Sequence, residues 1–233
     1  MSKKVAFITG GSTGLGFSLS KQLLKVGWSV IVDARNSDGL LDAARQDLSQ
    51  LGQVICVEGD ISDVNHVREV FELIKAQGRL DLIVNNASTL GVLPLRAVLD
   101  YSLDEIKAAY EINFFSPINV IQTLKEFFTE GMKIINVTSD AGKEPYSGWG
   151  IYGSSKAALE HISAVLALEN PSFNIYWIDP GEMQTRMKHD ADPSEDVSNL
   201  PVPDKIVPAF MKLISENFVS GRYEAHDLIQ ATE

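Results

Sequence analysis

The sequence predicts a doubly wound α/β fold: a parallel sheet of about seven strands with helices on both faces. Short runs of β-branched and apolar residues alternate with longer stretches whose apolar residues recur at helical spacing. The first run, Val5–Thr9, leads directly into a glycine-rich turn and then into an amphipathic pattern. Because strands that alternate with helices usually pair in parallel, we expect a single domain over residues 1–233.

The predicted elements alternate from the first strand to the last. The expected strands are Val5–Thr9, Ser29–Ala34, Gln53–Gly59, Leu80–Asn85, Met132–Ser139, Phe173–Ile178 and Gly221–Ala225. The expected helices are Gly14–Val26, Gly39–Leu51, Val64–Gln77, Leu103–Glu130, Ile151–Leu168 and Asp204–Asn217. The charged stretch 190–196 contains Pro193 and lacks periodicity, so we expect it to form a loop.

Composition excludes several classes of partner. The net charge is −11 with a pI near 4.8, which argues against nucleic acid as a partner. No apolar stretch is long enough to cross a membrane, and we expect no membrane partner. Cys56 is the single cysteine and lies in an apolar run, so a cytoplasmic protein without disulfides is expected. The four histidines lie in separate segments, so we expect no metal site.

The turn after the first strand has the composition of a phosphate-binding loop. Its glycines follow the spacing Gly-x-x-x-Gly-x-Gly at Gly10, Gly14 and Gly16. Glycine lets the backbone turn sharply and approach a pyrophosphate, which free amides at a helix N-terminus then bind. The turn therefore predicts a dinucleotide site that also includes Ser12, Thr13 and Leu15.

Tyr152 and Lys156 are four residues apart in a predicted helix, so they share one face. An ammonium close to a phenol favours the phenolate, and we expect Lys156 to lower the pKa of Tyr152 toward neutrality. Ser139 ends a predicted strand upstream, where its hydroxyl could polarise a substrate carbonyl. This trio predicts acid–base chemistry on a carbonyl or alcohol.

In this order, the two motifs resemble those of the short-chain dehydrogenase/reductase family, over essentially the whole chain. The resemblance implies a Rossmann fold and a catalytic tetrad of Asn113, Ser139, Tyr152 and Lys156, in which Asn113 holds a proton-relay water. Lys156 would also bind the nicotinamide ribose. The family's Asn-Asn-Ala-Gly motif is matched here except for its last residue, which is Ser88. The further cofactor residues that the resemblance implies are Asp60, Ile61, Asn86, Ala87, Pro180, Gly181, Met183 and Thr185.

The end of the second strand indicates which nicotinamide coenzyme binds. The family's NAD-selecting aspartate corresponds to Ala34, and its phosphate-binding arginine corresponds to Arg35. Asp33 is one residue too early and should point away from the side of the strand that Ala34 faces. Arg35 can bind a 2′-phosphate through paired N–H groups, with Ser12 and Asn36 as neutral donors. We therefore predict NADP(H), rather than NAD(H), as the coenzyme.

The substrate is expected to be a small molecule with a carbonyl group. Residues 182–203 should form a lid, and the expected pocket walls are Leu90, Pro145, Tyr146, Trp149 and Met183. Such walls suit a bulky ketone or diketone, as in the sepiapterin reductase and benzil reductase branch that the chain resembles. Three alternatives remain open: a 3-oxoacyl-carrier-protein reductase, a pteridine-type reductase, and an NADP(H)-binding sensor or scaffold without turnover. Family members commonly pair through their long helices, which implies a homodimer or homotetramer.

Overall fold

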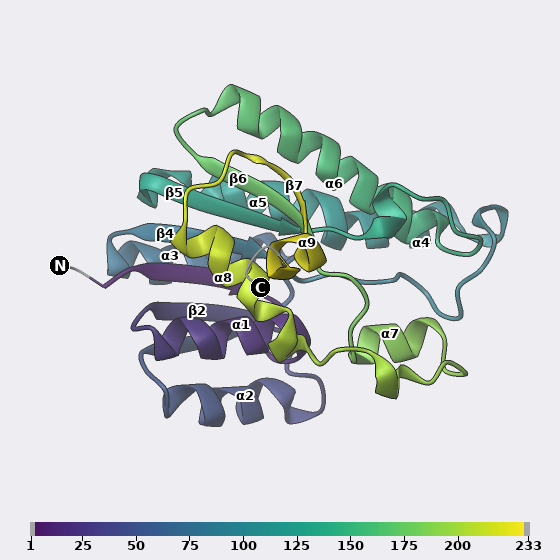
Figure 1. The fold of residues 1–233 in the computed structure, drawn as a ribbon, viewed down its shortest axis with the longest axis horizontal. Helices are drawn as coiled ribbons and strands as arrows, with labels where there is room; N and C mark the ends of the chain where they lie inside the picture. Colours follow the sequence, from purple (N-terminus) through teal and green to yellow (C-terminus); the bar gives the residue numbers. More distant parts are fainter. Residues whose placement is uncertain (1–2, 231–233) are drawn as a thin grey trace.

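The computed structural model describes residues 3–230, except the side chain of residue 38, and confirms the doubly wound α/β fold. Its strands form one parallel sheet in the order β3-β2-β1-β4-β5-β6-β7 (Figure 1). The strands are β1 (Val5–Thr9), β2 (Ser29–Ala34), β3 (Val54–Glu58), β4 (Leu80–Asn85), β5 (Phe128–Val137), β6 (Asn174–Asp179) and β7 (Gly221–Glu224).

Helices cover both faces of the sheet, because β1, β2 and β4 are buried at every position and offer apolar side chains in both directions. One face packs against α1 (Gly14–Lys25), α2 (Leu40–Ser49), α8 (Val207–Ser215) and α9 (Ala225–Gln230). The other packs against α3 (Val64–Gln77), α5 (Ser116–Leu124) and α6 (Gly150–Glu169). In Figure 1, α1 and α8 lie in front of the sheet, while α3 and α5 lie behind it.

The strand order reverses between β1 and β4, which places a crevice at their carboxyl ends. After β3 the chain returns across the sheet and adds β4 on the other side of β1. Thr9 joins the two strand ends, since its hydroxyl accepts hydrogen bonds from the amides of Asn86 and Ala87 at 3.0 and 2.9 Å. The glycine turn after β1 and the segment after β4 are thereby held side by side.

The predicted helix Leu103–Glu130 is interrupted in the structure. It consists of α4 (Leu103–Tyr110), a π-helical turn over Glu111–Phe115, and α5, after which the chain enters β5. Pro117 in the first turn of α5 has no amide hydrogen, so the carbonyl of Asn113 lacks its usual α-helical donor. Within the predicted lid, the sequence pattern also missed a short helix, α7 (Arg186–Ala191).

Ile83 offers a test of how tightly the sheet centre is packed. Its side chain is fully buried on β4, between Phe7 on β1 and Ile134 on β5. We expect Ile83→Ala to lower the free energy of unfolding by about 2–5 kcal/mol, measured by urea denaturation, because it leaves a cavity in a close-packed layer. Val219→Ala, at a side chain that is 83% exposed, is the control and should change it by less than about 0.5 kcal/mol. A loss below about 1 kcal/mol for Ile83→Ala would contradict this packing.

Candidate active site

A cavity of about 1080 Å³ opens along the carboxyl ends of β1, β2, β4, β5 and β6. It brings together most of the residues that the sequence predicted. These are Gly10, Ser12, Thr13, Gly14, Leu15, Arg35, Asp60, Ile61, Asn86, Ala87, Leu90, Ser139, Tyr146, Trp149, Tyr152, Lys156, Pro180, Gly181, Met183 and Thr185. Four predicted residues do not line it: Gly16, Asn36, Asn113 and Pro145.

The glycine turn has the geometry that a phosphate-binding loop needs. Gly10 and Gly14 have φ values of 68° and 57°, in the left-handed region that favours glycine. A Cβ atom on Gly16 would lie 2.5 Å from the carbonyl oxygen of Gly10, so only glycine lets α1 pack this closely against the turn. Thr13 makes no side-chain hydrogen bond to the start of α1. The N-terminus of this helix, at Gly14 and Leu15, therefore faces the cavity as an anion-binding end.

The Asp33 carboxylate contacts two groups within the protein. One carboxylate oxygen accepts the amide of Gly10 at 3.0 Å, and the other lies 3.0 Å from Nε2 of His66. Burial is the main influence on this carboxyl and raises its pKa above the usual range. Sequence reasoning placed His66 in a helix but missed this pair, because the two residues are joined only by the packing of α3 on β2. The pair supports the glycine turn, and both oxygens of Asp33 are engaged.

The neighbouring polar residues at the end of β2 differ in where they point. Arg35 is exposed and lines the cavity. Asn36 turns away: its amide donates to Asp42 at 3.1 Å and to Glu58 at 3.4 Å, and its oxygen accepts the amide of Leu41. Asn36 thus holds the start of α2 in this structure, and its expected bond to the coenzyme stays a prediction.

Tyr152 and Lys156 lie side by side in the first turns of α6. Their residues are only 7% and 2% exposed, and the Lys156 ammonium lies 5.6 Å from the centre of the Tyr152 ring. Nζ of Lys156 donates to the carbonyl of Val137 at 2.8 Å, which ties α6 to the end of β5. Gly153 faces the same turn, where a Cβ atom would lie 2.4 Å from the carbonyl oxygen of Ala141. This close approach explains the glycine that follows Tyr152.

The pKa of Tyr152 runs against the expectation from the sequence. Burial raises this pKa to about 12, hydrogen bonds with Ser139 and Ser88 lower it, and the nearby Asp179 and Asp140 carboxylates raise it. Burial also lowers the pKa of Lys156 to about 8. The lysine does not pull the phenol toward neutrality, because burial disfavours the charged form of both side chains. The chain thus holds a protonated phenol at neutral pH.

Ser139 and Ser88 approach the phenol from two different strand ends. Ser139 begins the 3₁₀ turn Asp140–Gly142, where its hydroxyl accepts the amide of Ala141 at 3.2 Å and donates to Asp140 at 2.9 Å. The Ser88 hydroxyl donates to Oδ1 of Asn113 at 3.0 Å. Ser88 is the residue at which the motif departs from the family pattern, and that departure was the signal that could have marked it.

Asn113 is fully buried behind the cavity wall. Its Oδ1 accepts the Ser88 hydroxyl and the Thr89 amide, and its Nδ2 donates to the Thr89 carbonyl at 2.8 Å and to the Ser155 hydroxyl at 2.9 Å. The side-chain amide is thus engaged on both sides within the protein. Any water at Asn113 would have to use its backbone carbonyl, which lacks an α-helical donor beside Pro117.

The substrate end of the cavity is only partly apolar. Leu90, Tyr146, Trp149 and Met183 line it as expected, and the Trp149 ring lies 5.7 Å from that of Tyr152. Pro145 does not reach it. The sequence analysis missed several further lining residues. They include the apolar side chains of Leu93 and Met187 and the carboxylates of Asp140, Asp179, Glu182 and Asp190.

The family model for short chain dehydrogenases matches residues 4–196 of this chain. The chain belongs to the short-chain dehydrogenase/reductase family. Among its relatives, a benzil reductase of Saccharomyces cerevisiae is 31% identical over 199 residues, which cover 80% of this chain and 74% of the relative. Sepiapterin reductase of Rattus norvegicus is 29% identical over 199 residues, covering 79% and 76%. The protein is therefore an oxidoreductase, and it lies near this branch of the family.

Solved structures show the same fold. A putative short chain dehydrogenase from Pseudomonas syringae superimposes with a TM-score of 0.89 at 24% identity, covering 96% of this chain and 95% of the other. One from Escherichia coli CFT073, solved in complex with NADPH, gives 0.84 at 22% identity and covers 97% of each chain. Within residues 3–230 of this short-chain dehydrogenase/reductase, no cluster of three metal-ligating side chains occurs. Across the same residues, no helix combines the length and hydrophobicity of a membrane span.

The buried Lys156 should make the stability of this reductase depend on pH. Its pKa falls from 10.5 to about 8 on folding, so the unfolded chain binds more protons in that window and stability rises with pH there. Between pH 8 and pH 10 we expect the free energy of unfolding of the parent to rise by about 2 kcal/mol relative to that of Lys156→Met, measured by urea denaturation. Lys107→Met, at a side chain that is 74% exposed, is the control and should follow the parent. A constant difference between parent and Lys156→Met would contradict a neutralised buried lysine.

Proposed function

We propose that this oxidoreductase uses NADPH to reduce a bulky ketone or diketone to the alcohol, in the cytoplasm. The observation that carries the proposal is the Tyr152 hydroxyl, which is buried in the cavity wall near the hydroxyls of Ser139 and Ser88. A protonated phenol at that position can give its proton to a carbonyl oxygen. The apolar side chains around it suit a substrate with aromatic or branched groups.

The residues present fit a nicotinamide coenzyme. The glycine turn packs closely on the segment after β4, since a Cβ on Gly10 would lie 3.0 Å from Cα of Ala87, and the start of α1 faces the cavity. The start of α1 would hold the pyrophosphate, Asp60 and Ile61 the adenine, and Pro180 with Thr185 the nicotinamide. When bound, the coenzyme supplies the hydride that the carbonyl carbon accepts.

Proton transfer is the part of the reaction that the chain's own residues perform. Tyr152 would donate its proton to the substrate oxygen as the hydride reaches the carbon, which gives the neutral alcohol. Ser139 would turn its hydroxyl hydrogen from Asp140 to that oxygen and stabilise its developing charge. Lys156, with a pKa of about 8, is mostly charged at pH 7 and would favour return of the proton to Tyr152 through water at the Asn113 backbone.

The preference for NADP(H) rests on the end of β2. Asp33 is poorly placed to bond the ribose 2′-hydroxyl, since it is only 2% exposed and its oxygens already contact Gly10 and His66. Arg35 is exposed at the cavity edge, where a guanidinium can meet a 2′-phosphate with two N–H groups. Ser12 lines the same edge and adds a hydroxyl donor.

Carboxylates at the substrate end favour a second candidate, a carbonyl compound that also carries amino groups, such as a pterin with a side-chain ketone. Asp140, Glu182 and Asp190 line the cavity and can accept hydrogen bonds from such groups. Initial rates of NADPH oxidation with benzil and with sepiapterin distinguish the two: a higher kcat/KM for sepiapterin would favour the second candidate.

Tyr152→Phe tests the acid assignment. The variant should lower kcat by about 10²–10⁴-fold, because the substrate oxygen then has no positioned proton donor. NADPH affinity, measured by protein fluorescence, should stay within about threefold of the parent because the ring is retained. Tyr223→Phe removes a hydroxyl outside the cavity and is the matched control. Turnover of Tyr152→Phe within tenfold of the parent would show that another group supplies the proton.

Arg35→Ala tests the coenzyme preference. It should raise the KM for NADPH by about 10–100-fold through loss of charge-assisted hydrogen bonds, and leave the KM for NADH within about twofold. Arg45→Ala, which removes an exposed arginine that does not line the cavity, is the control and should alter neither value. Equal increases for both coenzymes would contradict a role for Arg35 at the 2′-phosphate.

A further inference from the structure

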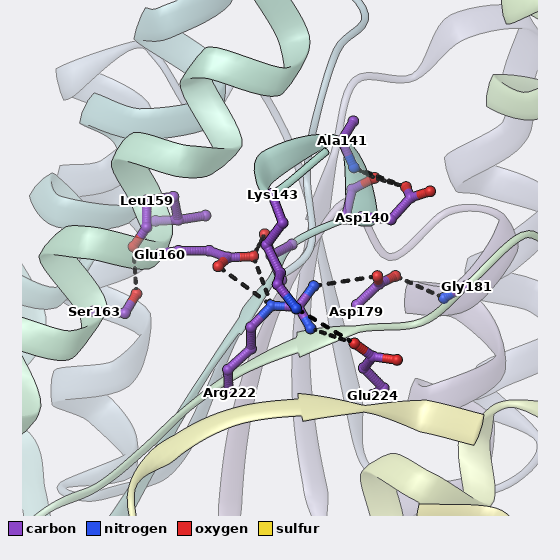
Figure 2. Close-up of polar contacts among 12 residues, drawn as sticks. Asp140, Ala141, Lys143, Leu159, Glu160, Ser163, Asp179, Gly181, Arg222 and Glu224 are labelled. Atoms are coloured by element: carbon purple, nitrogen blue, oxygen red, sulfur yellow. Dashed lines mark hydrogen bonds and ion pairs between the residues drawn. The ribbon is translucent and has the colours of Figure 1, made fainter. Parts of the chain in front are cut away.

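Arg222 on the edge strand β7 lies at the centre of an ion cluster next to the cavity (Figure 2). Its side chain is only 16% exposed. Nε donates to the two carboxylate oxygens of Glu160 at 3.1 and 3.3 Å, and Nη2 donates to Oδ2 of Asp179 at 3.3 Å. Nη1 donates to Oε1 of Glu224 at 2.8 Å. One guanidinium is thus shared by three carboxylates.

Glu160 connects this guanidinium to the proton-transfer side of the site. It lies on α6, one turn beyond Lys156, and its side chain is 13% exposed. Its Oε1 also accepts the hydroxyl of Thr138 at 2.7 Å, and Thr138 immediately precedes Ser139. Arg222 and Glu160 therefore hold α6 and the end of β5 in one arrangement, and these two segments supply Tyr152, Lys156 and Ser139.

Asp179 connects the same guanidinium to the coenzyme side of the site. It ends β6, and its side chain is 11% exposed. While Oδ2 accepts from Arg222, Oδ1 accepts the amide of Gly181 at 2.9 Å. That bond shapes the Pro180–Gly181 turn, which lines the cavity. A bend in this turn would move its backbone relative to the bound nicotinamide.

The identity of the cation matters because a guanidinium is a rigid planar fork. It presents five N–H groups in fixed directions, so it can bridge carboxylates on different segments, whereas an ammonium acts as a single flexible point charge. Glu160 and Asp179 are mostly buried, and leaving them without a shared cation is costly. Glu224 is different, since its side chain is 49% exposed and it lies on β7 itself.

We propose that Arg222 is a positioning residue for the reaction: it holds the Pro180–Gly181 turn and the Thr138–Ser139 strand end in place against α6. This inference rests on the proposed function for its kinetic consequence, but the placement of the two segments can be measured without coenzyme or substrate.

The experiment compares Arg222→Gln, Arg222→Lys, Asp179→Asn and Glu160→Gln with the parent. Glu224→Gln is the matched control, because it removes a half-exposed carboxylate from the same guanidinium and leaves the Arg222 bonds to Glu160 and Asp179 in place. Steady-state kinetics with NADPH and benzil give KM and kcat separately. Hydrogen–deuterium exchange of the free protein reports peptides that cover 178–185 and 138–142.

Arg222→Gln should raise the NADPH KM and lower kcat by about tenfold each, as small misplacements of reacting groups do. Asp179→Asn should act mainly on the NADPH KM and Glu160→Gln mainly on kcat. A general loss of stability would not divide the two parameters in this way. Arg222→Lys should stay closer to Arg222→Gln than to the parent. Both peptides should exchange faster in Arg222→Gln than in the parent, and their exchange rates should be unchanged in Glu224→Gln.

Equal exchange of both peptides in Arg222→Gln and Glu224→Gln would overturn the proposal, whatever the kinetics. So would kinetic losses of the same size in these two variants. A parent protein that fails to reduce any carbonyl would refute the proposed function instead, and the exchange measurement would still decide the role of Arg222.

Discussion

Burial of the Tyr152 phenol next to the Lys156 ammonium is the constraint on which the site depends. Burial keeps the phenol protonated and brings the pKa of the lysine to about 8, so a proton donor and a group that titrates near neutrality share one wall. The wall is built from segments that are distant in the sequence: Ser139 follows β5, Ser88 follows β4, and α6 carries the pair itself. Each hydroxyl approaches the phenol from a different strand end.

The reversal of strand order beside β1 explains why these segments meet. In a parallel sheet all carboxyl ends lie at one edge, and the reversal opens a crevice there. At the end of β2, two nearby polar residues have different partners. Asp33 is buried and supports the glycine turn together with His66, while Arg35, just beyond the last residue of the strand, is exposed at the cavity edge.

Two features behind the cavity wall hold the segments of the site in place. The π-helical turn before α5 and Pro117 leave the carbonyl of Asn113 without an α-helical donor, while its side-chain amide is engaged by protein groups. On the opposite side, Arg222 joins the coenzyme turn to the strand end that carries Ser139. The π-helical turn thus positions a backbone carbonyl, and the buried ion cluster positions a backbone turn and a hydroxyl group.

The sequence by itself determined the strands, the main helices, the glycine turn and the Tyr152–Lys156 spacing, because periodicity and short motifs are local properties of the chain. It missed the π-helical turn between α4 and α5 and the short helices α7 and α9. It did not determine that Asn36 turns toward α2, that Pro145 stays outside the cavity, or that Lys156 fails to lower the pKa of Tyr152. It also missed Arg222. These depended on the tertiary structure, since a side chain's partners and the cost of its charge are decided by burial among residues far away in the chain.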